Sequence, residues 1–152
     1  MTVSSDMPPV ARVPLAGLLA WLVPGLGHFF VGERVRGLIY LITITVTFWG
    51  GIAIGGVRDT VDPKGRTTWF MAQTCAGLNG LAAYGWAESL RQHPEAGPAE
   101  PGHHRSVETA VVYTGVAGLL NLLAILDALV RADYAPTRSR RAEAVTVKRA
   151  GP

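Results

Sequence analysis

The chain has 152 residues, of which 49% are hydrophobic and only 16% charged, against roughly a quarter charged in typical soluble domains. Its 14 basic and 11 acidic residues avoid four long stretches, in which Asp127 is the only charged residue. This segregation excludes a soluble globule and a disordered chain, and the single cysteine excludes a disulfide scaffold. A stretch of about 20 nearly uncharged residues matches the thickness of a bilayer's hydrocarbon core. The sequence therefore predicts an all-α integral membrane protein, a bundle of four transmembrane helices over residues 13–31, 37–57, 67–87 and 109–130.

The first predicted span, 13–31, follows a polar leader over 1–12 that we expect to be disordered. Pro24 interrupts this span, because it lacks the amide that would bond to the carbonyl of Ala20. We therefore expect a kink or a break at Pro24, with freed backbone groups near Ala20 and Trp21.

The second predicted span, 37–57, is rich in β-branched residues. Over 43–47 threonine alternates with isoleucine or valine, a period of two that is typical of a strand in water. An isolated strand leaves its backbone unpaired in lipid, and four spans are too few to close a barrel, so a helix is expected. Gly51 and Gly55 lie four residues apart, and this spacing predicts the close approach of another helix.

The third and fourth spans each carry a stripe of small residues that contains an asparagine. In the third span the stripe consists of Ala72, Ala76, Asn79 and Ala83. In the fourth it consists of Ala117, Asn121, Ala124 and Ala128. We expect the two spans to pack through these stripes, with Asn79 and Asn121 hydrogen-bonded across the interface at about 0.6 kcal/mol per contact. The alternative is a polar path through the bundle.

The polar segments complete the predicted organisation. Residues 88–106 contain several Pro and Gly and are expected to form a flexible outer loop. The histidines of this loop match no standard metal-site spacing, so neither a metal nor another cofactor is expected. The tail over 131–152 is basic and expected to be disordered, and it can contact anionic lipid headgroups.

The distribution of Lys and Arg predicts an orientation. With four spans both termini lie on one side, which then carries ten of these residues. The other side carries four: Arg34, Arg36, Arg91 and Arg105. The positive-inside rule therefore places both termini in the cytoplasm, in the cell membrane. We therefore attribute the net charge of +3 to basic residues that orient the helices in the membrane, and we expect no nucleic-acid partner.

Two ionisable residues inside the spans are candidates for a functional role. Asp127 is an intramembrane carboxylate, which is a functional hypothesis by default. Because Arg131 follows it at i+4 near the cytoplasmic end, a helix-end ion pair is favoured over substrate or proton handling. Four spans place Glu33 on the opposite face, so no pairing of that residue with this site is expected. His28 is expected to bond a freed carbonyl or interfacial water, with protonation or ligand binding as the alternative.

The stretch Pro24-Gly25-Leu26-Gly27-His28-Phe29-Phe30-Val31-Gly32, followed by Arg36-Gly37, resembles the turn of the TM-two (two-transmembrane-helix) domain superfamily and of related bacterial domains of unknown function. Residues 119–128 resemble the last helix of those relatives, which ends in an Asn-to-Asp pattern. The resemblance implies an integral membrane protein of unestablished activity, with no enzyme chemistry. The family usually has Tyr where Phe30 stands, so no role of that hydroxyl is carried over. Its turn residues are Pro24, Gly25, Gly27, His28, Phe30 and Gly32.

The sequence favours a structural or accessory role. All serines lie outside the spans and Asp127 is their only carboxylate, which argues against serine and aspartyl intramembrane proteases. There is no His-Glu-x-x-His motif, no phosphate-binding loop and no repeated pair of broken spans of the transporter kind. We therefore expect no catalytic residues, and a membrane-protein partner or a second copy as the binding partner. The alternative is a small transporter or channel that uses His28, Asn79, Asn121 or Asp127.

Overall fold

The computed structural model describes residues 7–93 and 104–150, with side chains over 7–93 and 106–134. The described residues contain helices and no strand, which confirms the all-α prediction. The helices are α1 (Pro9–Leu22), α2 (Leu26–Val31), α3 (Arg34–Gly55), α4 (Val57–Thr60), α5 (Thr67–Thr74), α6 (Leu78–Gln92) and α7 (His104–Ala150).

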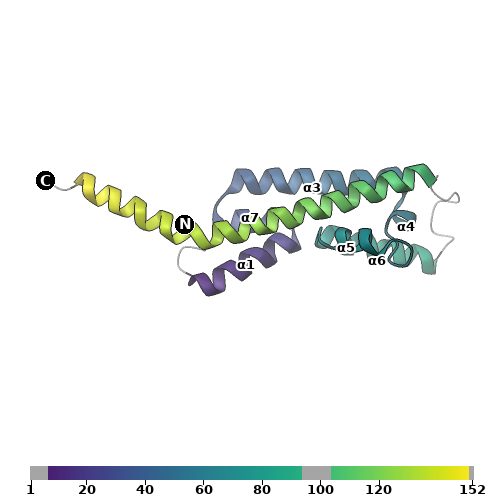
Figure 1. Cartoon of the computed structure of the whole chain (residues 1–152), viewed down its shortest axis with the longest axis horizontal. Helices are drawn as coiled ribbons and strands as arrows, with labels where there is room; N and C mark the ends of the chain where they lie inside the picture. Colours follow the sequence, from purple (N-terminus) through teal and green to yellow (C-terminus); the bar gives the residue numbers. More distant parts are fainter. Residues whose placement is uncertain (1–6, 94–103, 151–152) are drawn as a thin grey trace.

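The long helices α3 and α7 lie side by side and run antiparallel (Figure 1). Gly51 packs against Thr114, and one turn later Gly55 packs against Ala110. Without a side chain at these two positions the helix backbones approach closely. The prediction from the Gly51–Gly55 spacing is therefore confirmed, and the β-branched segment is a helix, as expected.

The first predicted span is a hairpin of two helices. α1 runs along α7 from Ala132, whose carbonyl accepts a bond from the Arg12 Nε, as far as Asn121, which bonds the Ala20 carbonyl. The chain then reverses at 23–25, where Val23 is extended and Gly25 adopts a φ of 84°. α2 returns along the same half of α7 and brings His28 to Asp127. The break expected at Pro24 is present, and it turns the chain back.

The third predicted span is a second hairpin of the same kind. α5 packs on α7, with Trp69 at Gly115 and the Cys75 carbonyl at Asn121. The chain turns at 75–77, where Gly77 adopts a φ of 63°. α6 then runs back beside α4, and Arg91 near its end bonds the carbonyl of Val61. This hairpin covers the other half of α7.

The two hairpins meet end to end beside the pair of long helices. At the meeting point Gly77 lies so close to the Trp21 carbonyl that a Cβ there would overlap it. Figure 1 shows the end of α1 facing α5 and α6 in this arrangement. α1–α2 and α5–α6 thus approach the middle of the bundle from opposite ends.

Only two helices of the described residues are long and apolar enough to cross a membrane. They are α3 (Arg34–Gly55) and the Ser106–Tyr134 part of α7, while α1 is a shorter apolar helix. The four-span bundle is not confirmed, because the segments 13–31 and 67–87 each reverse direction midway. Local hydropathy does not separate a kinked crossing from a hairpin, since both place the same apolar residues in sequence.

The outward faces of the two long helices are apolar. Exposed residues on α3 include Leu38, Ile39, Ile42 and Val46, and those on α7 include Leu119, Leu122, Leu123 and Leu126. Continuous apolar surface of this kind marks a membrane or protein contact. The inward faces are instead made of small residues: the fourth-span stripe of Ala117, Asn121, Ala124 and Ala128 is completely buried, as its spacing predicts.

The ends of the helices differ from the expected polar segments. α7 continues as a helix to Ala150 and projects beyond the bundle (Figure 1), whereas the sequence predicts a disordered tail over 131–152. α1 begins at Pro9, inside the leader assigned to 1–12. α6 and α7 take up both ends of the loop assigned to 88–106, and residues 94–103 lie outside the described part.

Candidate functional site

Asn121 joins the two hairpins at the middle of the bundle. Its Nδ2 group donates to the carbonyl of Ala20 at 3.3 Å and to the carbonyl of Cys75 at 2.9 Å. These carbonyls lie where α1 and α5 end, and helix ends leave such groups without a partner of their own. The two protons of the Asn121 amide thereby provide hydrogen bonds to one backbone carbonyl at each of the two helix breaks. The freed carbonyl expected at Ala20 is present, and Asn121 is its partner.

The predicted contact between Asn79 and Asn121 is wrong. The Oδ1 of Asn79 accepts a bond from the Trp49 indole at 3.1 Å, so Asn79 faces α3. The reversal at 75–77 turns α6 away from the line that a continuous helix would follow. Only the first half of the predicted third span, α5, therefore packs closely on α7.

A chain of ion pairs lies at the end of the bundle where α7 projects. Asp127 accepts a bond from the Nε2 of His28 at 2.9 Å and from the Nε of Arg131 at 2.8 Å. Arg131 in turn donates to Glu33 at 2.7 Å, and Glu33 pairs with Arg36 at 3.0 Å. The spacing-based prediction of the Asp127–Arg131 pair is thus met, and the pair belongs to a larger cluster.

The expectation that Glu33 lies on the opposite face from Asp127 is wrong. A continuous first span carries the turn at Glu33 to the far side of the bundle, whereas the hairpin returns it to the side where the chain entered. Arg131 then reaches both carboxylates. Pro24 predicts a break in the helix. It does not predict in which direction the chain continues after the break, so the approach of Glu33 to Arg131 could not be foreseen.

His28 is the buried member of this cluster. Its side chain has no exposed surface, and its ring packs against that of Tyr40 in a tilted arrangement, with centroids 4.7 Å apart. Nδ1 has no hydrogen-bond partner among the described residues. His28 therefore bonds a carboxylate of α7, where a freed backbone carbonyl or interfacial water was expected.

The turn residues of the Pro24–Gly32 motif hold the α1–α2 hairpin together. Pro24 is buried, and Gly27 packs against Ala16 of α1 and Ala128 of α7. Gly32 ends α2, where its amide bonds the carbonyl of Phe29, and Phe30 is half-buried. The motif is thus structural in its contacts, apart from His28.

A buried polar contact that the sequence does not predict lies in the other half of the bundle. The Nε2 of Gln73 donates to the carbonyl of Thr60 at 3.1 Å and to the Thr114 hydroxyl at 2.7 Å. All three residues are buried. The polarity of Gln73 within an apolar segment was the available signal, and its partners come from α4 and α7.

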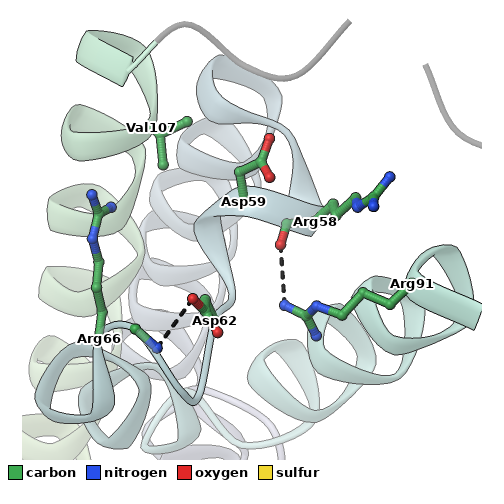
Figure 2. Close-up of a pocket in the computed structure, with 7 residues that line it drawn as sticks. Arg58, Asp59, Asp62, Arg66, Arg91 and Val107 are labelled. Atoms are coloured by element: carbon green, nitrogen blue, oxygen red, sulfur yellow. Dashed lines mark hydrogen bonds between the residues drawn. The ribbon is translucent and has the colours of Figure 1, made fainter. Parts of the chain in front are cut away.

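A pocket of about 380 Å³ opens at the end of the bundle opposite the ion-pair chain. It lies among α4, the start of α5, the end of α6 and the start of α7 (Figure 2). It is lined by Arg58, Asp59, Asp62, Gly65, Arg66, Arg91 and Val107. The sequence predicts none of these residues as site residues, because all of them lie outside the four predicted spans.

The fold and its polar contacts define an all-α protein with two helices of membrane-spanning length and two half-length hairpins. The model of the family of unknown function DUF6677 matches residues 15–140, so the chain belongs to that family. No curated protein and no solved structure matches the chain. The matched range contains the whole α5–α6 hairpin, the α1–α2 hairpin from residue 15 onward and the whole ion-pair chain.

Proposed function

We propose that the protein is a multi-pass protein of the cytoplasmic membrane, in which α3 and α7 cross the bilayer. The α1–α2 and α5–α6 hairpins enter halfway, from opposite faces, and meet at Asn121. Support comes from the apolar outward faces of the two long helices and from the satisfied backbone at both breaks. Irregular backbone at membrane depth is tolerated where protein buries it. Kinship with the TM-two superfamily, carried by the Pro24–Gly32 turn, is part of this proposal.

Both termini face the cytoplasm in this proposal. With hairpins in place of two crossings, the connection at 32–36 joins the side of the termini, and the connection at 56–66 moves to the other side. The side of the termini then carries nine Lys and Arg, and the other side carries five. The five are Arg58, Lys64, Arg66, Arg91 and Arg105. The positive-inside rule therefore still favours cytoplasmic termini.

Labelling of single cysteines tests this topology. In a Cys75→Ser background, Arg34→Cys and Lys64→Cys each place a thiol at an exposed position. An impermeant maleimide added to intact cells should label Lys64→Cys, and should label Arg34→Cys only after permeabilisation. Four full crossings predict the reverse, so labelling of Arg34→Cys from outside would contradict the proposal.

The proposed role is accessory: binding and assembly of a partner at the membrane. The observation that carries it is the closed centre, where Asn121 uses both amide protons on the hairpin ends and Gly77 abuts Trp21. The projecting part of α7 supplies a further surface, and its five basic residues over 138–149 suit a cytoplasmic partner or anionic lipid headgroups.

Site-specific photocrosslinking tests the accessory role. A photoreactive residue at 142, on the projecting part of α7, should give one discrete protein adduct in native membranes. The same residue at 42, on the apolar face of α3, is the matched control and should give mainly lipid adducts. Equal protein adducts at both positions, or none at 142, would count against partner binding through α7.

A small transporter or channel is the second candidate, and the pair of broken hairpins favours it. Interrupted segments that enter from opposite faces and meet at the midplane are typical of transporter binding sites. The Oδ1 of Asn121 is buried there without a partner among the described residues. Flux of ions or small solutes in proteoliposomes that is lost in Asn121→Leu, while the variant stays folded, would favour this candidate over the accessory role.

A further inference from the structure

The pocket at the end of the bundle gathers arginines from three different elements. Arg58 belongs to α4, Arg66 precedes α5, and Arg91 lies near the end of α6. Side chains this far apart in sequence converge because the α5–α6 hairpin returns to its starting end. The pocket lies beyond Gly55, where α3 ends, and beside Val107, near the start of the apolar part of α7.

Arg91 forms a fixed positive wall of the pocket. One terminal nitrogen of its guanidinium donates to the carbonyl of Arg58 at 3.1 Å and to that of Val61, and the other pairs with Glu88 at 3.4 Å. Figure 2 shows the bond to Arg58 and the Arg58 side chain turned away from the pocket. Arg91 thus contributes charge, while Arg58 lines the pocket mainly through its backbone.

Arg66 provides a donor that the described part of the chain leaves unused. Its Nη1 is buried and has no hydrogen-bond partner among the described residues. A buried guanidinium nitrogen without an acceptor carries a desolvation cost that an anion would offset. Guanidinium groups bind phosphate oxygens with charge-assisted, geometrically specific hydrogen bonds.

The acidic lining residues differ in what they do. The two carboxylate oxygens of Asp62 accept the backbone amides of Lys64 and Gly65, at 3.0 and 3.1 Å. This carboxylate therefore shapes the turn before α5. Asp59 also lines the pocket, and its negative charge opposes an anion there. Its removal is expected to have the opposite effect from the removal of Arg66.

We propose that this pocket binds a phosphate group through Arg66, with Arg91 as the second cation. The volume of about 380 Å³ exceeds what a bare carboxylate fills and accommodates a phosphate ester. Two sources share this chemistry: a free phosphate compound and a phospholipid headgroup. The headgroup source rests on the proposed membrane crossing of α3 and α7, which places the pocket at the headgroup level.

Calorimetry on the full chain in detergent, with inorganic phosphate as the probe, tests the site. Arg66→Gln should weaken binding about tenfold, since a charge-assisted bond is lost. Asp59→Asn should tighten binding by about threefold, because a like charge is removed. Arg34→Gln, at the opposite end of the bundle, is the matched control and should change affinity by less than about twofold, because a distant, exposed and screened charge contributes little.

The possible outcomes show whether the proposed site exists and whether its phosphate comes from a free compound or a phospholipid headgroup. If phosphate does not bind to wild type, or if Arg34→Gln loses as much affinity as Arg66→Gln, the proposed site is wrong. Retained binding in Arg66→Lys, with thermal unfolding unchanged, supports a charge contact over a folding defect.

Native mass spectrometry in phosphatidylglycerol nanodiscs tests the lipid source. A lipid that stays bound to the wild type and is released by Arg66→Gln supports a headgroup ligand. Phosphate binding without lipid retention supports a free phosphate compound. Labelling of Arg34→Cys from outside overturns the topology, while detergent binding of phosphate still supports the pocket.

Discussion

Arg131 donates a 2.7 Å hydrogen bond to Glu33, a residue 98 positions earlier in the chain. This pair holds the turn between α2 and α3 against α7 at the point where α7 leaves the bundle, on the side where the first hairpin starts. Because Arg131 also bonds Asp127, one guanidinium serves two carboxylates. The Arg131–Glu33 contact alone therefore shows that the first hairpin returns to its starting side.

Replacing Arg131 should destabilise the fold more than replacing Arg36, the other arginine of the ion-pair chain. Arg131→Gln leaves Glu33 and Asp127 without their shared partner and should cost about 1–3 kcal/mol in the free energy of unfolding. Arg36→Gln removes a pair whose arginine side chain is 53% exposed, and it should cost less than about 1 kcal/mol. Reversible unfolding in mixed micelles measures both. Equal losses would contradict the central position of Arg131.

Asn121 should be the most sensitive asparagine of the bundle. Asn121→Leu removes the donor for two carbonyls at once and should lower the free energy of unfolding by about 1–3 kcal/mol. Asn79→Leu removes only the acceptor for Trp49, and its effect should be near 0.6 kcal/mol.

A double-mutant cycle on these two asparagines distinguishes the observed arrangement from direct contact. Their side chains bond different partners, so the coupling energy should be below about 0.5 kcal/mol. A coupling well above that value would indicate that the two amides meet.

Gly77 should not tolerate a side chain. Its φ of 63° disfavours other residues, and a Cβ would overlap the Trp21 carbonyl. Gly77→Ala should therefore separate the hairpin ends and cost about 1–3 kcal/mol. Gly85→Ala is the control: it lies within α6 with no atom near a new Cβ, so the better helix former should be neutral or stabilising by up to about 1 kcal/mol. If the two variants unfold alike, the hairpin ends are not in contact.

Gln73 should need its amide nitrogen. Gln73→Leu leaves the Thr60 carbonyl and the Thr114 hydroxyl without this buried donor and should cost about 1–3 kcal/mol. Gln92→Leu, at the exposed end of α6, is the control and should change stability by less than about 0.5 kcal/mol. Thermal unfolding in detergent compares them. A neutral Gln73→Leu would argue against the contact between α4, α5 and α7.

The sequence by itself determined the helical class, the two long apolar segments, the break at Pro24 and the buried stripe around Asn121. These features follow from local rules: hydropathy marks the apolar segments, proline removes an amide, and small residues at helical spacing share a face. Each rule acts within a few turns of helix, so the residues that carry it are neighbours in the chain.

Only the tertiary structure decided where the chain goes after each break. A few backbone dihedrals at Val23–Gly25 and at Cys75–Gly77 choose between a kinked crossing and a hairpin, and both choices use the same apolar residues. That choice brings Glu33 to Arg131, separates Asn79 from Asn121 and gathers Arg58, Arg66 and Arg91 around a pocket. Such partners lie up to about a hundred residues apart, so their pairing depends on packing along the whole of α7, which a local pattern does not contain.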